Sequence, residues 1–257
     1  MILGITGGVG TGKSTILNYL REKYGAYLIS CDDVARQLQQ PEEECYGPML
    51  ELFQNTKIRY ADMDPDSDGN RDTENLLNKD GSFNRSVIAR KVFADVELLK
   101  ALNRIVHPAV KRRVRELIDS YIQTYNNIQS DSCPYFYRDS KIDAYKKGNK
   151  ESNNGIPLIV IEAALLLEDN YGEICDEIWY VRADEDVRRE RLRKSRGYSD
   201  EKIDSIFASQ RADESYRECC SVTIDNSSEN VQNTFRQLDE ALASRGIIPA
   251  DSDRSTD

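Results

Sequence analysis

The sequence predicts an α/β fold in which a five-stranded parallel sheet is flanked by helices. Two observations lead to this expectation. Short apolar segments that suit strands buried on both faces recur along the chain, and helical patterns separate them. The first such segment, Met1–Ile5, runs into a glycine-rich turn and then into a helical pattern that begins near Lys13. This alternation is typical of parallel sheets, because successive parallel strands need a crossover connection.

The glycine-rich turn, residues 7–14, reads GGVGTGKS and matches the phosphate-loop pattern G-x-x-x-x-G-K-[ST] at every position. We expect its four glycines to take positive φ angles and to let backbone N–H groups approach a phosphate closely. Lys13 would reach the β- and γ-phosphates of a nucleoside triphosphate, and the Ser14 hydroxyl would ligate the magnesium ion that bridges them. The sequence therefore predicts a nucleotide site between the first strand and the first helix.

Composition limits the other classes of function. The chain has 257 residues, of which 39% are hydrophobic and 31% charged, as in an ordinary globular protein. The net charge of −10 argues against nucleic acid as the main partner. No segment is apolar for long enough to span a membrane, and the chain enters its first strand without a signal peptide, so we expect a cytoplasmic protein. The six cysteines include no C-x-x-C pair and His107 is the single histidine, which argues against a zinc site.

The second strand is expected at Ala26–Cys31, and two acids follow it, Asp32 and Asp33. Ligands of doubly wound parallel sheets bind outside the carboxyl ends of the strands, so an acid here would face the phosphate loop. It could accept a proton from a hydroxyl group or hold magnesium. Aspartate is also a good helix N-cap. We favour the cap for Asp33 and catalysis for Asp32.

Helical patterns dominate the next part of the chain and are expected at Pro41–Phe53, Asn84–Val96 and Glu97–Tyr125. His107-Pro108 is expected to interrupt the last of them. A lone histidine beside a proline is more often a packing or capping residue than a catalyst. Two polar segments, 61–81 and 126–155, are expected to be exposed insertions.

The remaining strands are expected at Ile156–Glu162, Glu177–Arg182 and Ser221–Asn226. Glu162 lies at the carboxyl end of its strand, as Asp32 does, in a Walker-B-like position that could orient magnesium or water. Two helices, Asp184–Arg196 and Ser199–Arg211, are expected before the last strand, and one more follows it at Val231–Ala243.

The first of these helices is rich in basic residues, namely Arg188, Arg189, Arg191, Arg193, Lys194 and Arg196. In a kinase of this architecture such a helix belongs to a mobile lid over the triphosphate, where arginines stabilise the charge of the transferring phosphoryl group. The alternative is a solvated face that pairs with acids at helical spacing. We expect most of the six to form such pairs and one or two to be functional.

Several of these segments together resemble the dephospho-CoA kinase family. The resemblance covers Met1 to about Leu242 and is carried by GITGGVGTGKST at 4–15, CDDVAR at 31–36, LNRIVHP at 102–108, ALLLE at 164–168, RRER at 188–191, SQR at 209–211 and IDN at 224–226. It implies ATP-dependent phosphorylation of the ribose 3′-hydroxyl of dephospho-CoA, the last step of coenzyme A synthesis. The chain departs from the family pattern at Ser195, where an arginine is usual, and at Ser30, where the first acid of a D-x-D is usual.

The resemblance also implies roles for single residues. Asp32 would be the general base, and Lys13 and Arg191 would bind the phosphates, which makes these three the expected catalytic residues. The expected ATP-binding residues are Gly8, Val9, Gly10, Thr11, Gly12, Lys13, Ser14, Thr15, Arg191 and Asn226, the last near the adenine. The expected substrate-binding residues are Asp32, Arg36, His107 and Glu168, and the expected Mg²⁺ ligands are Ser14 and Asp32.

The expected domain is a phosphate-loop nucleotide-kinase-like domain over residues 1–247, in three parts. The core covers about 1–40, 156–182 and 220–247, the helical substrate subdomain about 41–155 and the Arg-rich lid about 183–219, and a disordered tail follows at 248–257. We expect ATP and Mg²⁺ as cofactors and a monomer or weak homo-oligomer with no nucleic-acid or membrane partner. The alternatives are another small-molecule or nucleotide kinase, or a nucleotide-dependent switch without a phosphoryl acceptor.

Overall fold

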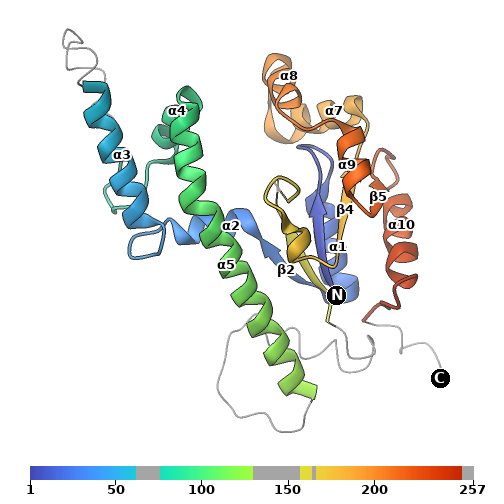
Figure 1. Ribbon diagram of the computed structural model, residues 1–257. Coiled ribbons are helices and arrows are strands. Elements are labelled where there is room, and N and C mark those ends of the chain that lie inside the picture. The colour runs from blue at the N-terminus through green and yellow to red at the C-terminus, as the bar shows by residue number, and fades with distance from the viewer. Residues whose placement is uncertain (62–75, 130–156, 164–165, 251–257) are drawn as a thin grey trace, which may run out of the picture. The chain divides into compact units, whose positions relative to one another are not determined.

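The computed structural model describes residues 1–61, 76–129, 157–163 and 166–250 (Figure 1). They form two compact units, one of Met1–Ser30 with Ile118–Asp257 and the other of Cys31–Leu117. Most of the insertions expected at 61–81 and 126–155, and of the tail expected at 248–257, lies outside the described residues.

The first unit contains the predicted five-stranded parallel sheet, which is confirmed (Figure 1). Its strands lie in the order β2-β3-β1-β4-β5, and every neighbouring pair is parallel. Their bounds are Ile2–Thr6 for β1, Tyr27–Ser30 for β2, Ile159–Glu162 for β3, Glu177–Arg182 for β4 and Val222–Asp225 for β5. The carboxyl ends of all five strands therefore meet at one edge of the sheet, which is where ligands bind in such folds.

One face of the sheet is covered by α1, Lys13–Tyr24, and α10, Val231–Ala243. Alternate residues of the strands point to this face, as expected for side chains of period two. Leu3 and Ile5 of β1 are fully buried there, in one apolar cluster with Ile16 and Leu20 of α1 and Leu238 of α10. The helix α1 ends at Gly25, whose left-handed backbone, φ 61, lets the chain turn directly into β2.

Three helices connect β4 to β5, where the sequence predicts two. They are α7, Glu185–Arg196, α8, Asp200–Ala208, and α9, Asp213–Cys219. The predicted C-terminal bound of the helix Ser199–Arg211 is therefore wrong, because α8 stops at Ala208. A new helix begins at Asp213 with two acids in its first turn, where negative charge is favourable. The ring of Tyr216 in α9 stacks on Tyr180 of β4 with centroids 4.6 Å apart, which fixes α9 against the sheet.

The second unit is helical and contains α2, Cys31–Leu38, α3, Tyr46–Ala61, α4, Arg85–Ala94, and most of α5, Val96–Gln129, whose residues from Ile118 onward belong to the first unit. The predicted interruption at His107-Pro108 is wrong, since α5 continues through Pro108. A proline inside a helix costs about 3 kcal/mol. Burial of Val106, Val110 and Val114 on either side of it holds the helix together despite this cost.

No helix in the described ranges is long and apolar enough to cross a membrane.

Candidate active site

The phosphate loop joins β1 to α1 at the carboxyl edge of the sheet. Gly10 and Gly12 have φ angles of 85° and 89°, a left-handed backbone that side chains with a Cβ rarely adopt. The Thr11 hydroxyl donates a hydrogen bond to the Gly8 carbonyl at 3.0 Å and closes the loop on itself. The loop ends at the N-terminus of α1, whose first N–H groups have no partner within the helix and favour an anion.

Gly8 is a glycine for a different reason from the one predicted. Its φ is not positive, so the expectation of a positive φ at this position is wrong. A Cβ atom here would instead lie 2.5 Å from Gln210 Oε1 and 2.7 Å from Arg188 Nη2. Side chains of the predicted lid therefore lie directly against the loop, and Gly8 provides the space for them.

Lys13 lies within the loop with its amino group on the backbone of the first two glycines. Its Nζ donates to the carbonyl oxygens of Gly7 at 2.7 Å and Gly8 at 3.3 Å. The carboxylate of Glu162, at the end of β3, is 4.0 Å from the same Nζ, and both side chains are largely buried. The sheet thus brings together the loop lysine and the acid of the predicted Walker-B-like position.

Arg188, from the first turn of α7, contacts the middle of the loop and was not among the predicted site residues. Its Nε donates to the Val9 carbonyl at 3.0 Å, and its Nη2 donates to Gln210 Oε1. The guanidinium lies 4.2 Å from the centre of the Phe207 ring, a cation–π contact. Burial lowers the pKa of this guanidinium, but an arginine remains charged in proteins. Its spacing of three residues from Arg191, which places both on one helix face, could have identified it.

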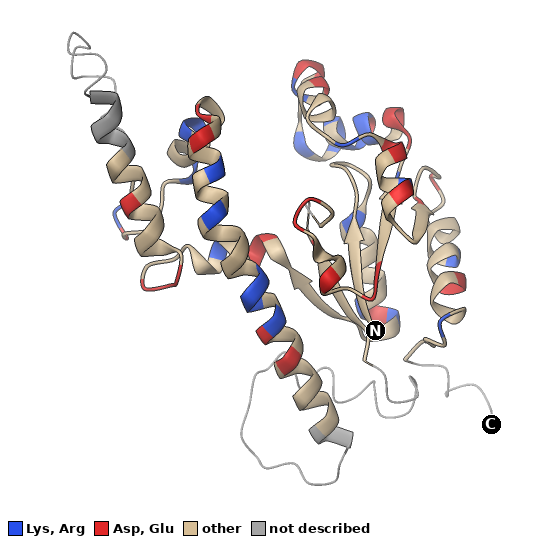
Figure 2. Cartoon of the chain, in the orientation of Figure 1, with Lys and Arg blue, Asp and Glu red and all other residues tan. Residues whose placement is uncertain are grey.

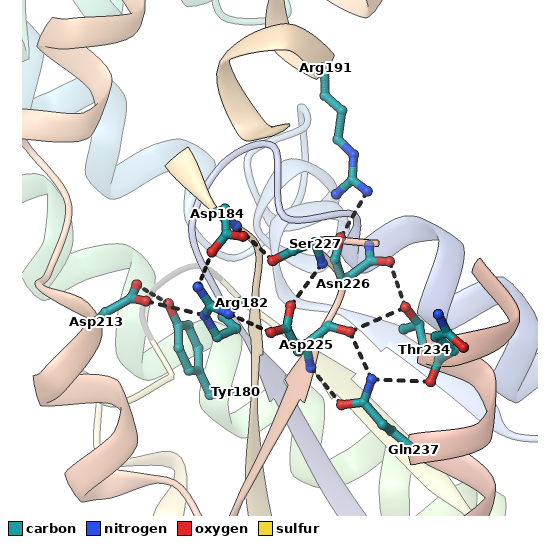
Figure 3. Close-up of polar contacts among 11 residues, drawn as sticks. Tyr180, Arg182, Asp184, Arg191, Asp213, Asp225, Asn226, Ser227, Thr234 and Gln237 are labelled. Carbon is teal, nitrogen blue, oxygen red and sulfur yellow. Dashed lines mark hydrogen bonds and ion pairs between the residues drawn. The ribbon is translucent and has the colours of Figure 1, made fainter. Parts of the chain in front are cut away.

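Arg191 lies one turn further along α7 and contacts the other end of the loop. Its Nη1 donates to the carbonyls of Gly10 at 3.5 Å and Thr11 at 3.4 Å, and its Nη2 donates to the Asn226 carbonyl at 2.9 Å (Figure 3). The Asn226 side chain lies against the loop, with Nδ2 2.8 Å from the Thr11 carbonyl. Two lid arginines and the residue after β5 therefore converge on the loop backbone.

Three of the other basic residues of α7 form ion pairs, as expected for a solvated face. Arg189 pairs with Glu185 at 3.1 Å and with Asp204 of α8 at 2.7 Å. Arg193 pairs with Asp200 of α8 at 2.5 Å, and Lys194 with Glu190. Figure 2 shows the resulting mixture of positive and negative charge on α7 and α8. The sequence did not identify the two partners in α8, Asp200 and Asp204, because they lie outside the helical spacing of α7.

The ends of β4 and β5 are held together by Arg182, which contacts three acids, Asp184, Asp213 and Asp225 (Figure 3). Because Asp213 begins α9 and Asp184 precedes α7, this single guanidinium joins α7 and α9 to the sheet. The Tyr180 hydroxyl also donates to Asp213. These contacts fix the base of the lid at the edge where the phosphate loop lies.

The remaining predicted residues of the first unit are more exposed. Ser14 and Thr15 are exposed in the first turn of α1. Glu168 accepts a hydrogen bond from Arg211 Nε at 3.0 Å, and this ion pair joins the segment after β3 to the end of the lid sequence SQR. The residue expected to bind the substrate is thus paired with a lid arginine.

Three predicted residues lie in the second unit. Asp32 is the second residue of α2 and is exposed, and His107 in α5 is half-buried. Arg36 donates to Asp33 Oδ1 at 2.7 Å. The predicted N-cap role of Asp33 is wrong, because α2 begins at Cys31 and Asp33 lies inside the first turn of this helix. The negative charge of Asp33 there interacts favourably with the helix dipole.

Within the part of the chain that the structure describes, no three His, Cys, Asp or Glu side chains gather closely enough to hold a metal ion. Mg²⁺ is commonly bound through only one or two protein oxygens together with the substrate phosphates. Ser14 and Glu162 provide hard oxygen atoms of this kind in the first unit.

Comparison with known proteins assigns the family. The family model described as dephospho-CoA kinase matches residues 1–130 and 142–232. The chain belongs to the dephospho-CoA kinase family. A dephospho-CoA kinase of Oceanobacillus iheyensis is 29% identical over 243 residues, covering 94% of this chain and 96% of that protein. The predicted family, fold class and activity, a kinase of the last step of coenzyme A synthesis, are confirmed.

Two solved structures share the fold of this kinase. A Thermus thermophilus protein, TT1252, has a TM-score of 0.61 at 23% identity and covers 95% of this chain and 97% of its own. A dephospho-CoA kinase from Campylobacter jejuni has a TM-score of 0.55 at 16% identity and covers 95% of this chain and 96% of its own.

Proposed function

We propose that the enzyme transfers the γ-phosphoryl group of ATP to the ribose 3′-hydroxyl of dephospho-CoA with Asp32 as the general base and Lys13, Arg188 and Arg191 as the phosphate-binding cations. Family membership supports the reaction. The observation that carries the phosphate side is the convergence of all three cations on the backbone of the loop at Gly7–Thr11. We expect the reaction to take place in the cytoplasm.

The three cations approach the loop from two sides. Lys13 contacts the carbonyls of its first residues, whereas Arg188 and Arg191 contact those of its middle and end. Phosphoryl transfer needs positive charge distributed around the transferring group, because the negative charge spreads over its oxygens in the transition state. A lid that carries two guanidinium groups at the loop supplies this charge and excludes water, which would otherwise hydrolyse ATP.

The acceptor side rests on Asp32, with Arg36, His107 and Glu168 as the proposed substrate-binding residues. Ser30 is the last residue of β2 and is paired with Glu162 of β3. Asp32 follows two residues later, in the first turn of α2. An exposed carboxylate at this point of the chain can accept the proton of the 3′-hydroxyl.

The proposed magnesium ligands are Ser14 and Asp32, with Glu162 close to the phosphate lysine. Hydroxyl and carboxylate oxygens fit this ion, which prefers hard oxygen ligands. When bound, Mg²⁺ would neutralise negative charge on the phosphates.

The experiment that tests the base compares Asp32→Asn with Asp33→Asn, its exposed neighbour in the same helical turn. We expect Asp32→Asn to lower kcat with dephospho-CoA by about 100-fold or more, since general-base catalysis contributes about 10²–10⁴ in rate. Asp33→Asn should stay within about threefold. ATP binding, measured by calorimetry, should survive in both. Equal kcat values for the two variants would contradict the role of Asp32.

A further inference from the structure

We infer that Asn226 and Thr234 are positioning residues that hold the phosphate loop at Thr11 and the lid at Arg191, and that Asn226 acts on ATP through the loop. This inference rests on the proposed function only in taking ATP as the loop's ligand. It replaces the expectation that Asn226 lies near the adenine with a different role for the same residue.

Both polar atoms of the Asn226 side chain are engaged inside the protein. Nδ2 donates to the Thr11 carbonyl at 2.8 Å, and Oδ1 accepts from the Thr234 hydroxyl at 2.9 Å (Figure 3). Both residues are buried: Asn226 is 4% exposed and Thr234 is fully buried. A buried amide whose two ends have such partners is fixed in one orientation.

The loop is shaped to receive this amide. A Cβ atom on Gly12 would lie 2.2 Å from Asn226 Nδ2, closer than any side chain could tolerate. Gly12 is the residue before α1, and its own carbonyl accepts the first hydrogen bonds of that helix. The amide therefore contacts the point at which the loop turns into α1.

The backbone of Asn226 fixes the lid in the same place. Its carbonyl accepts from Arg191 Nη2 at 2.9 Å, while Arg191 Nη1 lies 3.4 Å from the Thr11 carbonyl. Arg191 and the Asn226 amide thus share one acceptor residue, Thr11. Movement of Asn226 would displace the loop and the lid arginine together.

Asn226 itself is held by the sheet and by α10. Its N–H donates to the Arg182 carbonyl at 2.9 Å and extends the pairing of β5 with β4. Gln237, one turn after Thr234 in α10, donates to the Asp225 carbonyl and accepts from the Asp225 N–H, both at 2.9 Å (Figure 3). The position of the loop is therefore linked to the core through α10, by way of the contact between Thr234 and Asn226.

The test uses Thr234→Val, which keeps the shape of the side chain and removes the hydroxyl that orients the Asn226 amide. Binding of ATP, GTP and inorganic tripolyphosphate is measured by calorimetry for the full chain. We expect ATP and tripolyphosphate to bind about tenfold more weakly in the variant, because a buried hydrogen bond that fixes the loop is lost. The ratio of ATP to GTP affinity should not change. Thr234→Ser, which retains the hydroxyl, should bind all three ligands as the native protein does. Gln232→Ala, on the exposed face of α10, is the matched control.

Two results would overturn the inference. If ATP binding weakens while tripolyphosphate binding does not, or if the preference for ATP over GTP falls, Asn226 recognises the base. If all three ligands bind as in the native protein, the network contributes to packing alone. Because these measurements need no acceptor, they are independent of whether dephospho-CoA is the substrate, and a failure of the proposed reaction would be seen separately in the turnover assay.

Discussion

Arg188 Nε donates a hydrogen bond to the carbonyl oxygen of Val9 at 3.0 Å, so that a residue of the first lid helix is bonded to the middle of the phosphate loop. Gln210, after α8, accepts from the same guanidinium, and Phe207 lies beneath it. Arg188 of α7 therefore makes the bond to the loop, and Phe207 of α8 and Gln210 hold its guanidinium in place. Arg188 has the planar geometry and the position to contact a phosphate held by the loop.

Replacing Arg188 by lysine should impair ATP binding and transfer together. Lysine keeps the charge but carries its donors on one nitrogen, so it does not reproduce the two separate nitrogens from which arginine donates to Val9 and Gln210. We expect kcat/KM for ATP to fall by about tenfold or more, from the loss of charged hydrogen bonds. Steady-state kinetics would measure this, with Arg196→Lys at the exposed end of α7 as the control. An Arg188→Lys enzyme as active as the control would exclude a role in nucleotide binding.

Gly8→Ala tests the close approach of lid and loop without altering a charged group. The added Cβ would lie under 3 Å from the ends of the Gln210 and Arg188 side chains, so both must move. We expect KM for ATP to rise by about tenfold, with a small loss of stability, since the groups that move are the ends of side chains. Gly172→Ala, where a Cβ would meet nothing within 4 Å, is the matched control. A native KM in Gly8→Ala would show that these contacts are not needed when ATP binds.

The parallel sheet, the loop and the paired face of α7 could be predicted from the sequence because each depends on a local pattern. The strands are apolar runs, the loop is a continuous motif, and pairs such as Arg189 with Glu185 follow helical spacing. The continuation of α5 through Pro108 and the position of Asn226 could not be predicted in this way. The Asn226 amide depends on Thr11, a partner 215 residues away. The continuation of α5 through Pro108 depends on burial of the valines around the proline, which the local rule for proline does not contain.

The stability of the sheet should depend on pH through Glu177 at the start of β4. Hydrogen bonds from Arg245, Trp179 and Ser221 lower the pKa of this carboxyl to about 2, from an ordinary value of 4.5. Since the folded-state pKa is depressed, the stabilisation is fully present above about pH 4.5 and is lost as the pH falls toward 2. Its size is on the order of 2–3 kcal/mol.

Thermal or denaturant unfolding of Glu177→Gln across this pH range checks the assignment. Above about pH 5 the variant should be less stable than the native protein. The difference in stability should shrink as the pH is lowered toward 3, because Glu177 then takes up a proton in the unfolded state and the native protein loses this stabilisation. Glu22→Gln, at an exposed position in α1, is the control variant. A difference between Glu177→Gln and the native protein that stays constant with pH would contradict the depressed pKa.

The measurement that tests the central claim most directly is ADP formation from Mg²⁺-ATP with dephospho-CoA, AMP, adenosine or no acceptor. The account predicts that dephospho-CoA alone accelerates turnover, with coenzyme A as the phosphorylated product. Equal or faster turnover with AMP or adenosine would leave the loop and lid as described but contradict the acceptor. Turnover that no acceptor changes would contradict the assignment of this chain as a dephospho-CoA kinase.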